Sequence, residues 1–372
     1  MRILIINTLY SPYRIGGAEL SVQILAEGLV KSGHTVRVLT LHEFNYTKRD
    51  VINGVEVCYI PLKNIYWPFF EKSNSSKILK LFWHLIDNYN PFMKKYVAFE
   101  IEDFNPDVVH TNNLVGFSVS VWDVVAKYKI RLIHTARDYY LFHPNNTLFK
   151  NNKQQNVRSV SIKFWSYIKR IKSRKVDYFV GISKFIKNFY LENNFFDIKN
   201  SDYIYNPVER IYKEKINKSP KNIGFIGRLT VDKGFDTFCD LAKRYPEYNF
   251  VAAGRFSETE KNFFKNKAEN SNVKILGFVN IIDFIALVDI VILPIKWNEP
   301  FGRVVVECAL AEILVYTNRK GGVSELFDYF ENLRDISEFP NLNNENYNGN
   351  NKWLYDCETI VNLYFNVYGL KQ

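Results

Sequence analysis

Short apolar segments alternate with segments of helical periodicity along most of this chain. The first apolar segment is followed by a stretch in which apolar residues recur every three to four positions. This alternation is typical of a parallel sheet whose strands are joined by crossover helices. It predicts a helix over residues 18–31 and strands over residues 2–7, 36–41, 107–110, 131–135 and 178–182.

The same alternation starts again after Pro207. Further strands are predicted at residues 223–226, 250–253, 274–278, 290–293 and 314–317. Because 372 residues exceed what one hydrophobic core usually serves, the fold class is predicted to be α/β with two doubly wound, Rossmann-like domains. Ligands of such sheets bind beyond the carboxyl ends of the strands, so two domains facing each other would enclose a central cleft.

A polar run after Asn206-Pro207 marks the predicted domain boundary. The first domain is expected to span residues 1–206 and the second residues 207–352. A helical pattern of apolar residues returns in the tail, from about residue 353 to the end of the chain at residue 372.

Composition limits the cellular compartment that the chain is expected to occupy, but it does not identify the function. The chain carries 49 basic and 39 acidic side chains, a net charge of +10, which suits phosphorylated small molecules, anionic lipid head groups or nucleic acid equally well. No apolar stretch approaches the ~20 residues of a membrane span, and the N-terminal apolar run is too short for a signal peptide. The cysteines show no metal-ligand spacing, which predicts reduced thiols in a cytoplasmic protein; they are Cys58, Cys239, Cys308 and Cys357.

The segment PIKWNEPFGRVVVE, residues 294–307, places two carboxylates around a Phe-Gly turn. Glu299 lies in a loop after a predicted strand, and Glu307 lies inside the helix that follows. The backbone amides near Phe301 and Gly302 would point, with the helix dipole, at a negative group above the strand end. A phosphate fits such a place, whereas a salt-bridged pair on a solvated helix face is the plain structural alternative.

Three other loops carry candidate chemistry. Gly16-Gly17 separate the first strand from its helix, where glycine lets a ligand approach the backbone closely, although a plain tight turn explains the pair as well. Arg228 and Lys233 follow the strand that opens the second domain, and two cations there can hold a diphosphate or simply form a solvated basic loop. Gly321-Gly322, followed by Glu325, repeats the glycine pair.

Together these segments resemble the retaining glycosyltransferases of family 4, which have the GT-B fold. The segment around Glu299 and Glu307 is similar to that family's E-x7-E motif, in which the first Glu meets the hydroxyls of the transferred sugar and the second holds the ribose of the nucleotide. The resemblance implies that Arg228 and Lys233 bind the diphosphate. It also implies that Gly16 and Gly17 border the sugar and phosphates, that Gly322 shapes the nucleotide pocket, and that the tail helix packs on the first domain.

The resemblance also implies a functional histidine at a strand end in the first domain. His134 matches that position, but family members often read HDY in the next turn, where this chain has Arg137-Asp138-Tyr139. Arg137 therefore competes with His134 for the histidine's place. His110, Arg137 and Asp138 are further candidates on the acceptor side, with a satisfied core histidine as the alternative for His110.

The family implies transfer with retained anomeric configuration and a nucleotide-sugar as donor substrate. No DxD triplet occurs in the chain, which predicts catalysis without a divalent metal and without a cofactor. Neither the nucleotide base nor the sugar can be read from these motifs.

The acceptor side is predicted from one basic segment. Lys163 to Lys175, KFWSYIKRIKSRK, mixes aromatic and basic residues, as a helix lying on an anionic membrane does, and an ordinary amphipathic domain helix fits equally well. Residues 66–70 and 81–86 add aromatic side chains. With the family resemblance, they favour a glycan or lipid-linked acceptor and peripheral contact at the inner face of the cell membrane.

Two other classes of protein are alternatives to the enzyme. A non-catalytic membrane- or nucleic-acid-binding protein with the same fold would use the interleaved basic and aromatic residues. Such a binder has no need for Arg228, Lys233 and Glu299 together at strand ends, so no nucleic acid is expected. A nicotinamide-linked enzyme lacks its GxGxxG fingerprint here.

Overall fold

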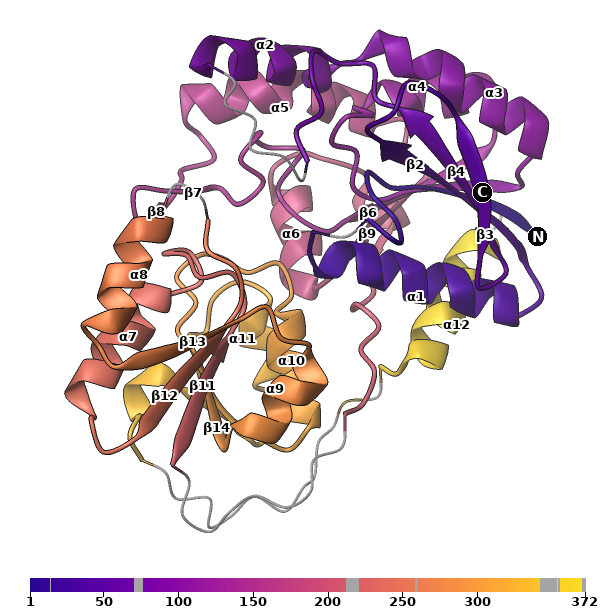
Figure 1. Ribbon diagram of the computed structural model, residues 1–372. Coiled ribbons are helices and arrows are strands. Elements are labelled where there is room, and N and C mark those ends of the chain that lie inside the picture. The colour runs from indigo at the N-terminus through magenta and orange to yellow at the C-terminus, as the bar shows by residue number, and fades with distance from the viewer. Residues whose placement is uncertain are drawn as a thin grey trace. The chain divides into compact units, whose positions relative to one another are not determined.

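The chain divides into two compact units by its internal contacts (Figure 1). The computed structural model describes residues 1–13, 15–69, 76–211, 221–257, 260–341, 353 and 355–369. The first unit comprises Met1–Leu148, Asn156–Pro207 and Cys357–Gln372, and the second comprises Phe149–Gln155 and Val208–Asp356. Each unit carries its own parallel sheet, so the predicted pair of Rossmann-like α/β units is confirmed.

Within the described residues, the first unit has an eight-stranded sheet in the order β10-β9-β6-β5-β1-β2-β4-β3. All neighbours pair in parallel except β3 and β4, which form an antiparallel hairpin at the edge. The strands are β1 (Arg2–Ile6), β2 (Thr35–His42), β3 (Lys48–Ile52), β4 (Val55–Pro61), β5 (Val108–Thr111), β6 (Arg131–Ala136), β9 (Tyr178–Gly181) and β10 (Ser201–Tyr203).

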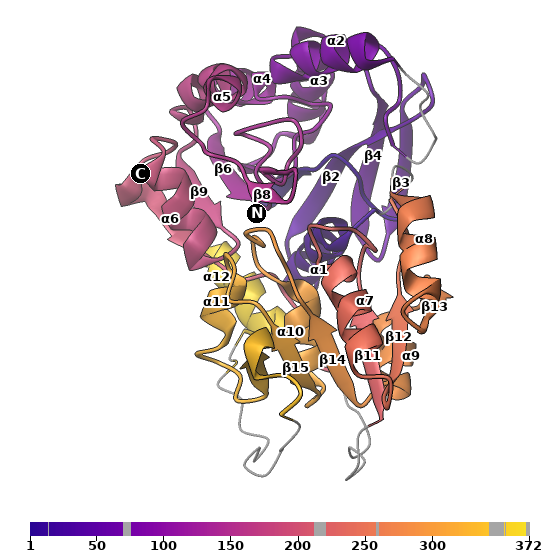
Figure 2. The same ribbon diagram turned by 90° about the vertical axis from the view of Figure 1, so that its left-hand side faces the viewer.

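Helices cover both faces of this sheet. Figures 1 and 2 show α2, α3, α4 and α5 gathered on one side of it, while α1 and α12 lie on the other. The central strands are therefore buried on both faces and read as continuous apolar runs. The helices are α1 (Gly17–Lys31), α2 (Lys77–Asn88), α3 (Lys94–Phe104), α4 (Ser120–Lys127), α5 (Val160–Ser173), α6 (Lys184–Glu192) and α12 (Cys357–Gly369), with short 3-10 turns at Pro91–Met93 and Ile198–Asn200.

Helix α12 belongs to the first unit although the second unit precedes it in the chain. It packs against α1, where Val361 lies so close to Gly28 that a Cβ on the glycine would come within 2.4 Å of it. Tyr368 hydrogen-bonds with His110 at 2.8 Å, and the main-chain oxygen of Val367 accepts from Arg131 at 2.9 Å. The helix begins at Cys357, four residues after the start expected from the sequence.

The second unit has a six-stranded parallel sheet, counted over its described residues, in the order β13-β12-β11-β14-β15-β16. The order reverses between β11 and β14, so the loops after these two strands diverge to opposite faces and leave room at their carboxyl ends. The strands are β11 (Asn222–Ile226), β12 (Asn249–Ala253), β13 (Val273–Gly277), β14 (Ile290–Leu293), β15 (Leu314–Thr317) and β16 (Leu333–Asp335). The helices are α7 (Phe235–Arg244), α8 (Lys261–Glu269), α9 (Ile281–Leu287), α10 (Arg303–Leu310) and α11 (Val323–Leu326), followed by a 3-10 turn at Ile336–Glu338.

One segment belongs to a different unit from the one predicted from the sequence. Residues 1–206 were expected to form one domain, but Phe149–Gln155 belongs to the second unit. It folds as a small hairpin of β7 (Phe149–Lys150) and β8 (Lys153–Gln154). The side-chain oxygen of Gln154 accepts a hydrogen bond from the main-chain amide of Asn298 at 3.1 Å, which fixes the hairpin to the loop before α10.

No helix in the described part of the chain is long and apolar enough to cross a membrane.

Candidate active site

The candidate site of the second unit lies where its strand order reverses. The loop after β11 carries Arg228 and Lys233 and leads into α7, and the loop after β14 carries Glu299 and leads into α10. The main-chain amide of Lys296 donates to the main-chain oxygen of Asp232 at 2.9 Å, so the two loops are joined directly. The cations and the first carboxylate of the predicted set are thereby brought together.

Glu299 is the centre of this arrangement. Its carboxylate pairs with the ammonium of Lys233 and accepts a hydrogen bond from the indole nitrogen of Trp297 at 2.9 Å. The ammonium of Lys233 also lies 5.1 Å from the ring centroid of Trp297. The side chains of Lys233 and Glu299 are 23% and 13% exposed, so water still reaches both. Sequence reasoning missed Trp297, although it stands two residues before Glu299.

Two glycines allow the loops to approach so closely. Gly234 has φ +81°, and a Cβ there would come within 1.9 Å of the main-chain oxygen of Pro294. Gly321 has φ +62°, and a Cβ there would come within 2.4 Å of the main-chain oxygen of Glu299. That oxygen accepts from the amide of Gly322 at 2.7 Å. The predicted glycine pair therefore supports the main chain of Glu299, and at position 321 only glycine fits without strain.

Arg228 is held more loosely than Lys233. Its guanidinium donates to Asp232 at 2.9 Å, and its side chain is 56% exposed. An exposed ion pair of this kind contributes little to stability because water competes for both charges. The guanidinium is therefore available to an anion without a large cost to the fold.

The side chain of Glu307 is 11% exposed, about as enclosed as that of Glu299. It lies one turn into α10, and its carboxylate accepts from Arg303 at 2.8 Å. Burial raises the pKa of Glu307, and the charge of Arg303 opposes that rise. Gly302 caps the helix with φ +92°. The side chain of Phe301 is buried beside Trp353, with ring centroids 6.1 Å apart, so only its main chain could serve a ligand.

In the first unit, the predicted glycine pair begins α1. The amide of Gly16 donates to the carboxylate of Glu19 at 2.9 Å, and Gly17 is the first helical residue. A Cβ on Gly16 would contact only Glu19, at 3.9 Å, so packing within the unit does not require glycine at this position. Glu19 is a residue that sequence reasoning missed; a Glu three residues after a helix start is a capping-box signal.

Arg137 lies just beyond the carboxyl end of β6 and is held on two sides. Its guanidinium donates to Asn112 at 2.9 Å and to Asn206 at 2.5 Å. Its charge also acts on Glu19, where it opposes the rise in pKa that burial causes. Arg137 therefore links the loop after β6 to the residues that follow β5 and β10.

Asp138 is half-buried next to Arg137. Burial raises its pKa to about 6, against the hydrogen bond that it accepts from the amide of Tyr140 at 2.8 Å. Lys169 of α5 lies nearby in the core, donates to the main-chain oxygen of Tyr140 at 2.7 Å, and has its pKa lowered by burial to about 8. Asp138 therefore stays a candidate on the acceptor side, at the edge of the small cavity that it lines with Arg137.

Both predicted histidines are buried in the first unit. His134 does not end its strand, because β6 continues to Ala136. Its ring packs between Trp122 and Phe196 and hydrogen-bonds with the hydroxyl of Thr111 at 3.0 Å, and burial lowers its pKa to about 3. A neutral, enclosed imidazole is the alternative that the sequence left open, and we do not assign His134 to the site.

His110 is likewise a core residue. Its two ring nitrogens hydrogen-bond with Tyr368 at 2.8 Å and Thr135 at 2.7 Å, and burial lowers its pKa well below the ordinary value. The cavity nearest these groups, lined by His134, Arg137 and Asp138 among others, measures about 10 Å³, the size of one water. His134 lines this cavity and His110 does not.

Among the residues that the structure describes, no three His, Cys, Asp or Glu side chains gather as metal ligands would. Cys58, Cys239 and Cys308 are buried, Cys357 is half-buried, and none of the four forms a disulfide.

Comparison with known proteins identifies the family to which this chain belongs. Residues 15–210 match the family described as Glycosyltransferase Family 4, and residues 209–341 match the family described as Glycosyl transferases group 1. The chain belongs to the family 4 glycosyltransferases. This glycosyltransferase is 46% identical over 347 residues to an uncharacterized 42.6 kDa protein in the cps region of Klebsiella pneumoniae, covering 91% of this chain and 92% of that one.

A more distant relative of the glycosyltransferase has a named reaction. The chain is 22% identical to this relative, the 2-deoxystreptamine N-acetyl-D-glucosaminyltransferase of Niallia circulans, over 90% of this chain and 88% of that one. Among solved structures, this chain resembles Anabaena HepE in complex with UDP and glucose, with a TM-score of 0.70, 18% identity and coverage of 98% of both chains. Sucrose-phosphate synthase from Thermosynechococcus elongatus follows at a TM-score of 0.68 and 15% identity, covering 87% and 83%. These structures confirm the GT-B fold.

Proposed function

We propose that this glycosyltransferase moves a sugar from a nucleotide-sugar donor to a glycan or lipid-linked acceptor in cell-surface polysaccharide synthesis. Three similarities support the substrate classes: the Klebsiella relative is described from a cps region, HepE was solved with UDP and glucose, and the Niallia relative is a glucosaminyltransferase. Within the structure, the proposal rests on one observation, the pairing of Lys233 with Glu299 at the strand-order reversal of the second unit.

In the proposed reaction, the bond between the sugar's anomeric carbon and the diphosphate breaks, and an acceptor hydroxyl forms a new bond to that carbon as it loses its proton. Negative charge develops on the departing diphosphate. Lys233 and Arg228 would bind that charge, together with the main-chain amides of Phe301 and Gly302. When the diphosphate attracts Lys233, the carboxylate of Glu299 would become able to accept hydrogen bonds from the sugar's hydroxyls. The hydrogen bond from Trp297 would hold that carboxylate in place.

Glu307 would bind the ribose, and its pairing with Arg303 sets the direction of its carboxylate. Gly16 and Gly17 would let the donor approach the main chain of the first unit, which agrees with the open space beside Gly16. We further propose that transfer retains the anomeric configuration and needs no divalent metal; the lack of a DxD triplet supports the second point.

The proposal includes a cytoplasmic enzyme in peripheral contact with an anionic membrane through residues 163–175. Most of this segment forms α5, which ends at Ser173, and its aromatic residues divide between two environments. Trp165 faces the core, whereas Phe164 and Tyr167 are exposed beside basic side chains. That division supports a helix that packs on its domain and still offers apolar side chains to lipid.

The test is donor hydrolysis and thermal shift across UDP-, GDP-, ADP- and dTDP-sugars, with and without a chelator, for the wild type and Glu299→Gln. We expect one nucleotide to raise the melting temperature of both proteins, and hydrolysis to be lost only in the variant. Loss of wild-type hydrolysis in the chelator would contradict metal independence. If no nucleotide-sugar stabilises the wild type, the proposed donor class is wrong.

A further inference from the structure

A basic pocket opens on the helical layer of the first unit, formed by α3 and α4. Its volume is about 250 Å³, and Lys94, Lys95, Asp123, Lys127 and Tyr128 lie along it. None of these residues takes part in the proposed donor chemistry. The pocket is therefore a second feature that calls for an explanation.

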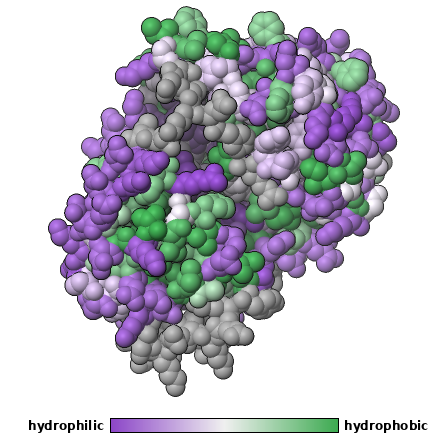
Figure 3. Space-filling model, in the orientation of Figure 1, coloured by the Kyte–Doolittle hydropathy of each residue, from purple (hydrophilic) through white to green (hydrophobic). Residues whose placement is uncertain are grey.

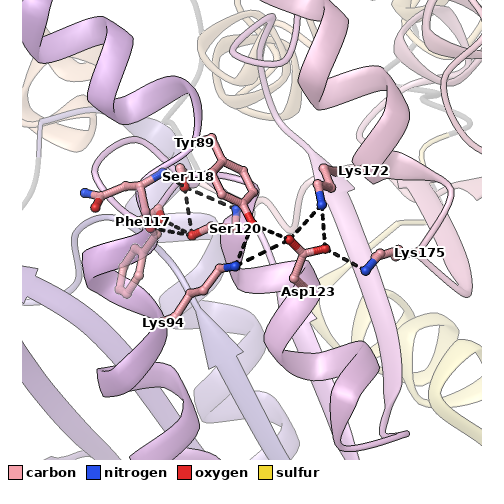
Figure 4. Close-up of polar contacts among 9 residues, drawn as sticks. Tyr89, Lys94, Phe117, Ser118, Ser120, Asp123, Lys172 and Lys175 are labelled. Atoms are coloured by element: carbon pink, nitrogen blue, oxygen red, sulfur yellow. Dashed lines mark hydrogen bonds and ion pairs between the residues drawn. The ribbon is translucent and has the colours of Figure 1, made fainter.

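Asp123 is the carboxylate at the centre of this pocket (Figure 4). It lies 2.8 Å from the ammonium of Lys172, 2.6 Å from that of Lys175 and 3.6 Å from that of Lys94. The hydroxyl of Tyr89 donates to it at 2.6 Å. Burial alone would raise the pKa of Asp123, but the hydrogen bonds from Lys172 and Lys175 outweigh it and hold the pKa well below its ordinary value. The carboxylate thus stays charged and ties α3, α4 and the end of α5 together.

One carboxylate does not balance the charge around it. Lys95 and Lys127 also line the pocket, both are exposed, and neither has a carboxylate within 4.0 Å among the described residues. Tyr128, which also lines the pocket, donates a hydrogen bond to Glu102. Three lysines therefore line the pocket with one carboxylate, Asp123. Ammonium groups gathered in this way repel one another, and an anion in the pocket would relieve that repulsion.

Exposed apolar side chains lie on α2, α3 and α5 of the first unit. Phe99 lies one helical turn beyond Lys95 on α3 and is 59% exposed. On α5 an exposed stripe follows helical spacing, formed by Val160, Phe164, Tyr167 and Ile171. A second stripe on α2 consists of Ile78, Leu81, Phe82 and Leu85. Figure 3 shows hydrophobic residues along the edge of the molecule where α2 lies in Figure 1. Soluble monomers rarely expose adjoining apolar stripes of this kind without a binding partner.

We propose that the pocket between α3 and α4 binds the phosphate group of an anionic phospholipid while the apolar stripes of α2 and α5 contact the lipid surface. This inference rests on the membrane contact proposed above and gives it a defined head-group site. A free phosphate would satisfy the lysines but would leave the apolar stripes in water. A phospholipid satisfies both features at once.

The test compares binding to vesicles of phosphatidylcholine alone and of phosphatidylcholine with phosphatidylglycerol. The pocket variant is Lys95→Ala with Lys127→Ala, since neither lysine is needed for the ion pairs of Asp123. The matched control is Lys243→Ala with Lys265→Ala, which removes the same charge from exposed helix positions of the second unit. We expect the pocket variant to lose affinity for the anionic vesicles on the order of tenfold and the control to keep wild-type affinity.

Equal losses in the pocket variant and the control would overturn the proposal, because they would reflect net charge alone. Equal binding of the wild type to both kinds of vesicle would also overturn it. Inorganic phosphate should displace the wild type from anionic vesicles more strongly than chloride at the same ionic strength; equal displacement would show that the pocket does not recognise phosphate. If inorganic phosphate stabilises the wild type through Lys95 and Lys127 and no vesicle binds, a free anion is the ligand and the lipid is excluded.

Donor hydrolysis, measured in parallel, keeps the two proposals apart. The pocket variant should hydrolyse donor at the wild-type rate, because its changes lie outside the second unit. A wild type that binds anionic vesicles through the pocket without hydrolysing any donor would support the pocket and count against the proposed function. Melting temperatures of both variants establish that they are folded.

Discussion

The strand ends of the two units hold similar residue types in opposite environments. In the second unit, Lys233 and Glu299 pair with each other where water reaches them. In the first unit, His110 is fully buried, and both of its ring nitrogens are hydrogen-bonded within the core. A charged group that water reaches can exchange its partner for a ligand at small cost, whereas a buried one cannot. The comparison favours the loops of the second unit as the place of the proposed donor chemistry and His110 as a stabilising core residue.

The largest effect is expected from Lys233→Met in the second unit. Removing the ammonium takes away a charge that stabilises the departing diphosphate, so donor turnover should fall by roughly 10²- to 10³-fold. Stability should change by about 1 kcal/mol or less, because the ion pair is partly solvated. The measurements are kcat for donor hydrolysis and the melting temperature.

Lys296→Met is the control for that prediction. Lys296 lies in the same pair of loops and pairs with Asp236, not with Glu299. It should retain most of the turnover. A similar loss in both variants would mean that turnover responds to the general charge of the loops, and the special role of Lys233 would fail.

His110→Leu tests the other side of the comparison. The change leaves the hydroxyls of Tyr368 and Thr135 buried without their partner, so the free energy of unfolding should fall by about 2 to 3 kcal/mol. Turnover by the protein that remains folded should not change. Tyr368→Phe, which removes one hydroxyl, should cost about 1 kcal/mol. A stable His110→Leu protein without transfer activity would return His110 to the acceptor side.

Asp138→Asn gives a smaller effect that depends on pH. Because burial raises the pKa of Asp138 above its ordinary 3.8 to about 6, the folded protein holds the proton more tightly than the unfolded chain does. The resulting stabilisation is complete below the unfolded pKa and is lost as the pH rises through about 6. The variant lacks this loss, so its stability relative to wild type should improve by up to a few kcal/mol between about pH 4 and pH 7. Urea unfolding at both pH values measures the difference, and a constant difference would show that Asp138 does not titrate in this way.

Gly16→Ala is expected to have the smallest effect on stability. An added Cβ meets only Glu19 at an ordinary contact distance, so the melting temperature should stay unchanged while KM for the donor rises. Gly234→Ala is the contrasting variant, because its Cβ would collide with the main chain at Pro294 and its φ is positive. It should be destabilised. An unchanged KM in Gly16→Ala would remove the first unit's glycine pair from the donor site.

The strands that carry the candidate site were predictable because they are short, apolar and buried on both faces. The edge hairpin of β3 and β4 was missed, although Asn53-Gly54 between them is a typical hairpin turn, with positive φ at both residues. Lys48–Ile52 is mostly exposed and polar, so its sequence does not show the apolar pattern that marks the other strands. The hairpin at Phe149–Gln155 was missed because its assignment to the second unit depends on a long-range hydrogen bond.

The residues of the candidate site likewise divide into those that could be predicted from the sequence and those that could not. Glu299, Arg228 and Lys233 could be found because their loops follow clear strands and match a family motif. The position of His134 could not be fixed from the sequence, since two more residues of β6 follow it before the strand ends. Trp297 lacked any signal apart from its neighbour, and its contact with Glu299 depends on how the loop after β14 folds back.

The position of α12 constrains the order in which the protein can mature on the ribosome. The first unit is translated first, but the hydroxyls of Tyr364 and Tyr368, which reach Thr135 and His110, emerge only after the whole of the second unit. Until then the polar groups beneath α12 lack these partners, and the apolar face of α1 that Val361 covers is open. The nascent first unit therefore cannot complete its core during synthesis, whereas the second unit has all its segments by Asp356 and can.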